Sequence, residues 1–202
     1  IIKTNGYAPH ENDRWIKNRI QAYKARLNLR KSTAPVQIIT GHLHAKSLKN
    51  LYAKGHAFVL PTRGEGVGLP FLEAMASGIP VIATGWGGQM DFLNKGNAFL
   101  VPYRLRPTLA TLNRRSTLSR SFRHLFGEQG QLWAEADRTA LMKLMRLAAR
   151  NPALCRAKGE RGRKEAAKWS WARAGKLMKK AIELTIRRKS RNHATTGSAG
   201  RA

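Results

Sequence analysis

The sequence predicts an α/β fold in which helices cover both faces of a parallel β-sheet. Short apolar runs alternate with segments of helical periodicity over the first half of the chain, and the connections between them are short. The runs at residues 36–39, 57–60 and 80–83 are almost continuously apolar, which is typical of strands buried on both faces. After residue 137 the periodicity is helical throughout, so we expect C-terminal helices beside the sheet.

The first strand is expected at the very start of the chain, in residues 1–4, and a helix follows over residues 11–29. Further strands are predicted at residues 35–40, 57–62, 79–84 and 97–103, and helices at 47–54, 69–77 and 88–94. Pro70 suits the first turn of the third helix, and Gly78 ends it. Strands that alternate with helices in this way form a Rossmann-like half.

We expect four segments along the chain. Residues 1–103 form the Rossmann-like core, whose first strand looks truncated, and residues 104–130 form an irregular basic segment with six arginines. Residues 131–188 supply helices of the same domain, over 137–150, 151–169 and 170–188. Residues 189–202 lack apolar periodicity and are expected to be a disordered basic tail.

Length and composition bound the class of protein. A chain of 202 residues has room for one α/β domain with a helical extension, but two full Rossmann domains would need more. It has no apolar run long enough to span a membrane and no recognisable signal peptide. The single cysteine, Cys155, excludes an internal disulfide and fits a cytoplasmic location. Because the chain lacks an initiator methionine, we expect it to be part of something longer.

The charge is strongly basic and unevenly distributed. Lys and Arg number 38 against 11 Asp and Glu, a net charge of +27, of which +8 falls within residues 1–103 and +19 beyond. Such a field attracts phosphate polymers and anionic lipid, so peripheral contact with the inner face of a membrane is one expectation. A dedicated nucleic-acid role is disfavoured, because zinc-finger spacing, RNA-recognition aromatics and zipper heptads are all missing from the sequence.

The stretch "RGEGVGLPFLEAMASGIPVIAT" at residues 63–84 carries the clearest chemistry. It runs from a strand end through the glycines at 64, 66 and 68 into a helix, and ligands of open parallel sheets bind at this edge. Glycines allow the backbone to approach a ligand closely, and a helix N-terminus presents unpaired N–H groups with positive partial charge. The stretch therefore predicts an anion site, with a phosphate or pyrophosphate as the ligand.

Two glutamates of this stretch, Glu65 and Glu73, stand beside the predicted phosphate site. A carboxylate repels phosphate, and its natural partner is a pair of vicinal hydroxyls, as on a ribose or a hexose. Phosphate, ribose and sugar together indicate a nucleotide-sugar. From spacing alone the alternative stays open that Glu73 answers the helix dipole and that Glu65 is a turn residue.

The whole stretch, with "GGQMDFL" after it, resembles the donor site of the family 4 retaining glycosyltransferases. These enzymes have the GT-B fold of two facing Rossmann-like domains, and their Glu-Gly-x-Gly-Leu-Pro-x-x-Glu-Ala block corresponds to residues 65–74 here. Similar segments occur at "TGHLHAKSLKNLYAKGHAFVLPT", "GQLWAEAD" and "KWSWARAGKLM". The resemblance covers residues 1–102 and 130–185, and it implies one half of a GT-B fold.

The resemblance also implies residue roles. Glu73 would bind the donor ribose, and Glu65 would face the transferred sugar as the catalytic residue. The donor would be held further by strand-end side chains, by loop amides and by a loop beside the nucleobase: Thr62 and Arg63, then Gly66, Val67, Gly68 and Leu69, then Gly41, His42 and Leu43. A surface histidine without a ligand stays an equal alternative for His42. Asp91 is expected to support a helix start rather than to react.

The resemblance is incomplete. The family's Arg and Lys for the leaving diphosphate have no match, Lys3 is not assigned their role, and the N-terminal domain with most acceptor contacts is absent. We expect neither a cofactor nor a metal, because no Asp-x-Asp motif is present. The predicted function is the donor-binding half of a hexosyltransferase, with a carbohydrate, lipid or protein acceptor. The alternative is a module that binds a nucleotide-sugar or an anionic surface without turnover.

Overall fold

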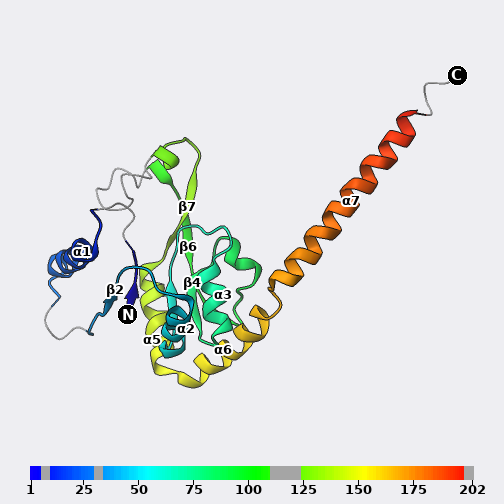
Figure 1. Ribbon diagram of the computed structural model, residues 1–202. Coiled ribbons are helices and arrows are strands. Elements are labelled where there is room, and N and C mark those ends of the chain that lie inside the picture. The colour runs from blue at the N-terminus through cyan, green and yellow to red at the C-terminus, as the bar shows by residue number, and fades with distance from the viewer. Residues whose placement is uncertain (6–9, 30–33, 110–123, 198–202) are drawn as a thin grey trace. The chain divides into compact units, whose positions relative to one another are not determined.

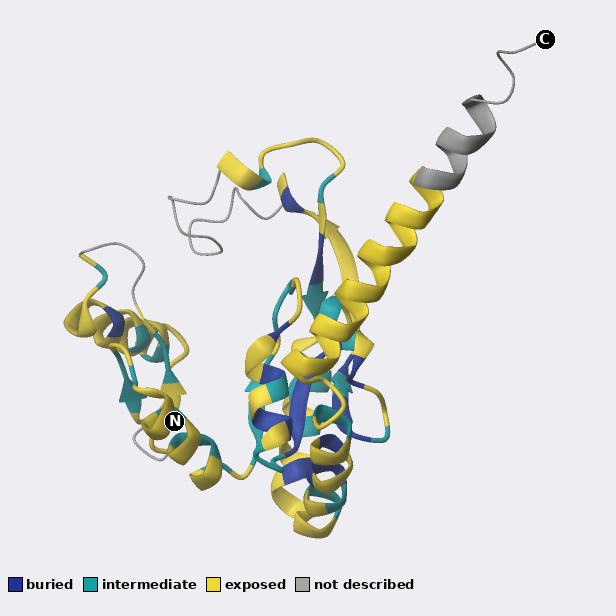
Figure 2. Cartoon of the chain, turned by 45° about the vertical axis from the view of Figure 1, so that its right-hand side comes forward, coloured by how far each residue is buried: buried dark blue, intermediate teal, exposed yellow. Residues whose placement is uncertain are grey.

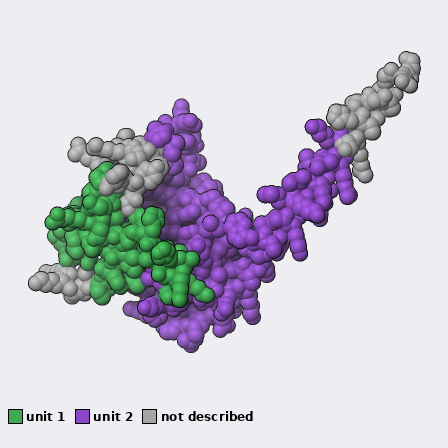
Figure 3. Space-filling view, viewed as in Figure 1, with its two compact units in different colours: residues 1–50 green, residues 51–202 purple. Residues whose placement is uncertain are grey.

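The computed structural model describes residues 1–5, 10–29, 34–109 and 124–197, and the chain divides into two compact units. Unit 1 comprises residues 1–50 and unit 2 comprises residues 51–202 (Figure 3). The residues that we expected to form one core, 1–103, are shared between these units. Each unit is described by itself below.

Unit 1 contains a short parallel sheet and one helix. Strand β1 (Ile2–Lys3) pairs in parallel with β2 (Ile38–Ile39), and α1 (Asp13–Arg26) lies between them in the chain. The side chain of Asn12 caps α1 by accepting a hydrogen bond from the amide of Trp15 at 3.1 Å. The hydroxyl of Thr40 donates to Oδ1 of Asp13 at 2.6 Å, which ties the segment after β2 to the start of α1. Helix α2 (Ala45–Lys54) crosses the boundary between the units.

Unit 2 is built on three parallel strands in the order β3, β4, β5. They are β3 (Phe58–Leu60), β4 (Val81–Thr84) and β5 (Ala98–Val101), with Phe58 opposite Val81 and Val81 opposite Ala98. Helix α3 (Leu69–Ala76) connects β3 to β4, and the 3₁₀ helix η1 (Gly88–Asp91) lies between β4 and β5. The connections are the short crossovers that the alternating pattern predicted.

The central strand β4 is buried on both faces, as its apolar run predicted (Figure 2). Val81 and Ala83 pack in one hydrophobic cluster with Phe71 and Met75 of α3, whereas Ile82 packs in a second cluster. Successive side chains of a strand point to opposite faces, so the sheet has one cluster on each side. The second cluster is covered by α5 (Arg138–Arg150) and by the start of α6 (Pro152–Ala166). The predicted parallel sheet with helices on both faces is confirmed.

A hairpin that the sequence did not predict follows β5. Strands β6 (Tyr103–Pro107) and β7 (Leu132–Ala136) pair in antiparallel register, with Arg104 opposite Glu135 (Figure 1). The first residues of the expected irregular segment, 104–107, therefore belong to a strand. All of β6 is exposed, so it lacks the alternation of apolar and polar residues by which a half-buried strand is recognised. The middle of the segment, residues 110–123, lies outside the described residues.

The last helix, α7 (Trp171–Gly197), extends into the segment that we expected to be disordered. Residues 189–197 contain no proline, and adding a residue to an existing helix gains a hydrogen bond without a new nucleation cost. Helix formation thus overrides the missing apolar pattern there, and residues 198–202 lie outside the described part.

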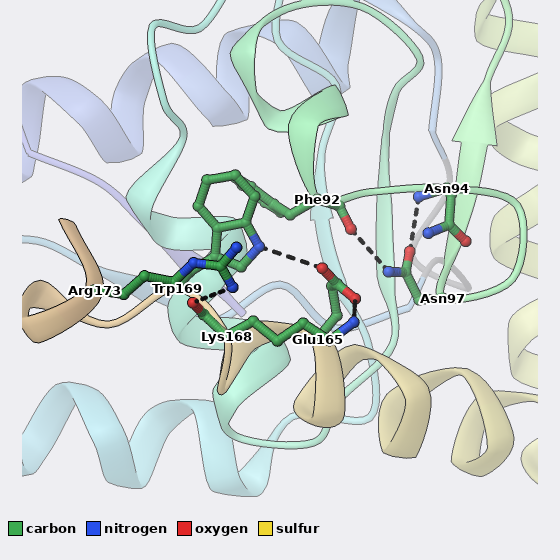
Figure 4. A network of polar contacts seen from close by, with 7 residues as sticks. All are labelled: Phe92, Asn94, Asn97, Glu165, Lys168, Trp169 and Arg173. Atoms are coloured by element: carbon green, nitrogen blue, oxygen red, sulfur yellow. Dashed lines mark hydrogen bonds and ion pairs between the residues drawn. The ribbon is translucent and has the colours of Figure 1, made fainter. Parts of the chain in front are cut away.

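The junction of α6 and α7 is fixed against the loop after η1 (Figure 4). The ring of Trp169 packs edge-on against Phe92, with centroids 5.5 Å apart, and its indole N–H donates to Glu165 at 3.4 Å. The same carboxylate accepts from Lys168 at 2.7 Å. The side chain of Asn97 holds the loop by donating to the carbonyl of Phe92 at 2.8 Å.

Candidate functional site

The loop between β3 and α3 turns into the helix at a left-handed glycine. Gly68 has φ +79°, and its carbonyl accepts a hydrogen bond from the amide of Phe71 at 2.9 Å. A Cβ at this position would lie 2.6 Å from Cδ2 of Phe71, so glycine is required by conformation and by space. This residue is the N-cap of α3 and has no capping side chain. The predicted glycine-rich entry to the helix is present.

A second glycine segment, between β4 and η1, lies directly against this loop. The amide of Gly88 donates to the carbonyl of Glu65 at 2.9 Å, and a Cβ on Gly88 would overlap the carbonyl oxygen of Gly66. Gly87 has φ +109°, which favours glycine. The two backbones approach closely only because position 88 has no side chain.

Gln89 holds the second segment in place from the inside. Its side chain is fully buried, and Nε2 donates to the carbonyls of Thr84 and Trp86 at 3.2 and 2.5 Å. Its Oε1 is buried and accepts no hydrogen bond from the residues that the structure describes. The sequence analysis did not predict this role for Gln89.

Backbone N–H groups of the first loop remain available for a ligand. Within the described residues, the amides of Gly66, Val67 and Gly68 donate no hydrogen bond, and the amide of Leu69 belongs to the helix turn that has no internal acceptor. The positive end of the α3 dipole lies at the same place. Unpaired amides at a helix N-terminus form an anion site, as the sequence predicted.

Glu65 lies between two cavities of unit 2. The first has a volume of about 510 Å³ and is bounded by Glu65, Gly87 and Met90, and the second has about 810 Å³ and extends to the β6–β7 hairpin. Gly64, Glu65 and Trp86 line both. The carboxylate is half-buried and makes no ion pair within the described residues. It therefore stands where a ligand in either cavity could reach it.

Glu73 lies in the second turn of α3, exposed at the surface and outside the lining of both cavities. Its Oε2 accepts a hydrogen bond of 3.0 Å from the hydroxyl of Tyr52 in α2. Tyr52 is half-buried and packs edge-on against Phe58, with ring centroids 5.7 Å apart. Burial, with the neighbouring carboxylate as the second cause, raises the pKa of Tyr52, so its hydroxyl stays a donor. The sequence analysis did not single out Tyr52.

Thr62 and Arg63 follow β3, and the side chain of Arg63 makes its contacts within the protein. The guanidinium of Arg63 donates two hydrogen bonds to Glu135 of β7, at 2.9 and 3.2 Å, and lies over the ring of Trp133 at 4.7 Å. The carbonyl of Thr62 accepts from the hydroxyl of Thr84 at 2.7 Å. Thr62 and Arg63 both line the larger cavity, and the partner Glu135 was not predicted.

Comparison with known proteins identifies the family. The family model described as "Glycosyl transferases group 1" matches residues 12–112, which is half of the chain. The chain belongs to this family of glycosyltransferases.

Curated relatives match this glycosyltransferase chain over short segments. It is 45% identical to the sulfoquinovosyl transferase of Arabidopsis thaliana over 56 residues, and 46% identical to the O-antigen chain mannosyltransferase B of Escherichia coli over 44 residues. It is 51% identical to the sucrose synthase of Melioribacter roseus over 39 residues. The segments cover 28%, 22% and 19% of this chain but only 11%, 12% and 5% of those proteins. The chain thus spans a small part of the length of the relatives it matches.

A solved structure supports the fold. Sucrose-phosphate synthase from Thermosynechococcus elongatus matches with a TM-score of 0.59 at 23% identity, over 91% of this chain and 38% of that one. At this identity the likeness concerns the fold alone. The expected half of a GT-B fold is confirmed.

The three remaining donor-site candidates of this glycosyltransferase chain lie in unit 1. Gly41, His42 and Leu43 follow β2, and Gly41 has φ +77°, as a tight turn requires. The glutamate loop belongs to unit 2, so a role of these three residues at the donor stays a prediction. Asp91 lies in the first turn of the short helix η1, where an acidic side chain suits the helix start, as expected.

Metal and membrane features can be stated for the described residues. There, no group of three or more His, Cys, Asp or Glu side chains is arranged to hold a metal ion. Over the same residues, no helix combines the length and the apolar character needed to cross a bilayer. Metal independence stays a prediction.

Proposed function

We propose that this chain is the donor-binding half of a hexosyltransferase that moves a sugar from a nucleotide-sugar to an acceptor hydroxyl with retention. The observation that carries the proposal is the loop at residues 64–68. Its unpaired amides point to an anion at the start of α3, and its glycines allow a diphosphate to approach the backbone. Membership of the group 1 glycosyltransferases supports the reaction class.

The two glutamates bind the remaining parts of the donor, the ribose and the transferred sugar. Glu73 accepts hydrogen bonds from the ribose hydroxyls, and its hydrogen bond from Tyr52 fixes one carboxylate oxygen and leaves the other for the ligand. Glu65 faces the transferred sugar from the wall that both cavities share. Glycine amides and Leu69 hold the distal phosphate, Thr62 and Arg63 border the pocket, and Gly41, His42 and Leu43 flank the nucleobase.

Transfer breaks the bond between the anomeric carbon and the diphosphate oxygen, with positive charge on the ring and negative charge on the leaving group. Preorganised amides and the α3 dipole stabilise the leaving diphosphate, which is the largest electrostatic demand of the step. The acceptor hydroxyl attacks from the same face and passes its proton to the departing diphosphate oxygen, so the configuration is retained. The basic side chains and the helix N-terminus take the part of a metal in this scheme.

Calorimetric titration of the chain with UDP-, GDP- and ADP-sugars tests the proposal. One of these donors should bind, and Glu73→Gln should weaken it about tenfold or more, because a hydrogen bond to a charged group is lost. Glu160→Gln is the matched control, since this glutamate of α6 is also exposed and should leave the affinity unchanged. The proposal fails if no donor binds or if the two variants behave alike.

A further inference from the structure

The larger cavity of unit 2 is lined by neither Glu73 nor residues 67–69, and of the loop amides only that of Gly66 belongs to its lining. One wall consists of residues 61–66 and Trp86, and the other consists of β7, Phe126 and the start of α5. Its volume of about 810 Å³ lies within the range of small-molecule sites. The β6–β7 hairpin creates this cavity, because the second wall depends on it.

The charged side chains that line this cavity balance, since two are basic, Arg63 and Arg138, and two are acidic, Glu65 and Glu135. Arg63 and Glu135 neutralise each other through two hydrogen bonds. The carboxylate of Glu65 forms no ion pair among the described residues, and the hydroxyl of Thr62 is buried without a partner among them. The indole N–H of Trp133, a residue that is 6% exposed, has no described partner either. The cavity thus offers hydrogen bonds to a ligand that is itself uncharged.

Apolar groups of the cavity suit the flat face of a ring. Trp86 is 39% exposed and Leu132 is 54% exposed, and both line the cavity. Trp133 gives no open face, because Arg63 lies over its ring and Phe126 packs 5.7 Å from it between centroids. The ring of Trp86 also contacts Tyr103, with centroids 5.4 Å apart. Its remaining exposed surface, beside carboxylates, fits a pyranose, whose C–H face is apolar and whose rim carries hydroxyls. With equal numbers of basic and acidic side chains, this lining gives a phosphate no net attraction.

We propose that the larger cavity is a carbohydrate subsite that binds a neutral hexose ring of the acceptor. The ring stacks on Trp86, and its hydroxyls bond to Glu65 and to the Arg63–Glu135 pair. This inference rests on the proposed donor site, because Glu65 and Trp86 line both cavities. A sugar in the larger cavity then lies beside the transferred sugar, as an acceptor must.

Saturation-transfer NMR with methyl α-glucopyranoside, methyl α-galactopyranoside and methyl α-mannopyranoside tests the subsite on the whole chain. At least one glycoside should bind. Leu132→Trp fills the larger cavity alone and should weaken binding at least tenfold, whereas Leu177→Trp, at an equally exposed leucine of α7, should change nothing. Glu135→Gln keeps the shape but loses the charge pair, and it should weaken binding about fivefold or more.

The result that overturns the subsite is that no glycoside binds, or that Leu132→Trp binds as well as the unchanged chain. The variant Glu73→Gln separates this inference from the proposed function. It should weaken binding of the nucleotide-sugar and leave binding of the glycoside unchanged. If a glycoside binds as described but no nucleotide-sugar does, the subsite stands as a carbohydrate site and the donor assignment fails. If the nucleotide-sugar binds and the glycoside does not, the donor assignment stands and the carbohydrate subsite fails.

Discussion

At the scale of single residues, the carboxylate of Glu73 depends on a tyrosine from another helix. The hydroxyl of Tyr52 donates to Glu73 at 3.0 Å and approaches the carbonyl of Pro70 at 3.4 Å. The contact joins α2 to the first turns of α3. Tyr52 is therefore a positioning residue for the glutamate that we assign to the ribose.

Tyr52→Phe removes this hydrogen bond and keeps the ring in place. We expect about a fivefold loss of donor affinity, because one hydrogen bond is worth roughly 1 kcal/mol. Calorimetry with the donor that binds the unchanged chain measures it. Tyr23→Phe, at an exposed tyrosine of α1, is the control. An unchanged affinity in Tyr52→Phe would show that Glu73 is held without this contact.

The same hydroxyl predicts a pH dependence of stability. Burial raises the pKa of Tyr52 above the ordinary value of 10.0, so the folded state disfavours the phenolate. The contribution of neutral Tyr52 is fully present below pH 10 and is lost as the pH rises from there towards the folded-state pKa. Ultraviolet titration should show a late tyrosine transition that belongs to Tyr52. If Tyr52→Phe keeps the late transition, the assignment is wrong.

Gly88 tests the contact between the two glycine segments. Gly88→Ala should lower the free energy of unfolding by about 2 kcal/mol or more, because the new methyl group overlaps the carbonyl of Gly66. It should also lower the affinity for the donor. Gly64→Ala is the matched control, since a Cβ there meets no atom within 4 Å. Thermal and urea unfolding measure both. Equal stability of the two variants would contradict the close approach of the segments.

The contacts of single residues show which features of the site can be predicted from the sequence and which cannot. The glycines and the two glutamates could be predicted because their chemistry is local to one stretch. The pair of Arg63 and Glu135 spans 72 positions, so no spacing rule detects it. Lys158 is buried and donates to the carbonyls of Lys95 and Ala98 at 2.6 and 3.0 Å, although a lysine in a basic helix predicts a solvated side chain.

At the scale of elements, the sequence predicted the described strands and helices that carry a strong apolar period. The parallel strands β3, β4 and β5 follow from their apolar runs, and α5 follows from its apolar stripe. The β6–β7 hairpin was missed because it has an exposed, arginine-bearing strand and a distant partner. It borders the larger cavity, so the missed element bears on the site.

Helix α7 exposes an apolar face along its length. All its residues from 171 to 189 are exposed, and Trp171, Met178 and Ile182 fall on one side of the helix while Lys176 and Lys180 fall on the other. Large exposed apolar faces mark interaction sites.

Met178→Gln with Ile182→Gln should reduce self-association of the isolated chain without lowering its thermal midpoint, since neither side chain is in the core. Lys176→Gln with Lys180→Gln is the control on the opposite side of the same helix. Sedimentation velocity at several concentrations measures association. Loss of folding in the first double variant would show that the apolar face packs within this chain.

At the scale of the whole molecule, a net charge of +27 attracts any polyanion. This general attraction has to be distinguished from specific binding of a phosphate at the loop amides. The two effects respond differently to salt. Attraction to the overall charge falls steeply as salt rises, whereas a diphosphate held by several backbone amides at a helix end is screened less. A test of donor binding is therefore sharpest at raised ionic strength.

The central claim is that the amides of residues 66–69 hold the donor diphosphate. Proton–nitrogen correlation spectra of the labelled chain, recorded at raised ionic strength with UDP, GDP or ADP added, test it most directly. The account predicts that one nucleotide shifts the amide signals of Gly66, Val67, Gly68 and Leu69, and that Glu73→Gln diminishes these shifts. Shifts confined to the basic surface of α7, with the loop amides unmoved, would contradict it.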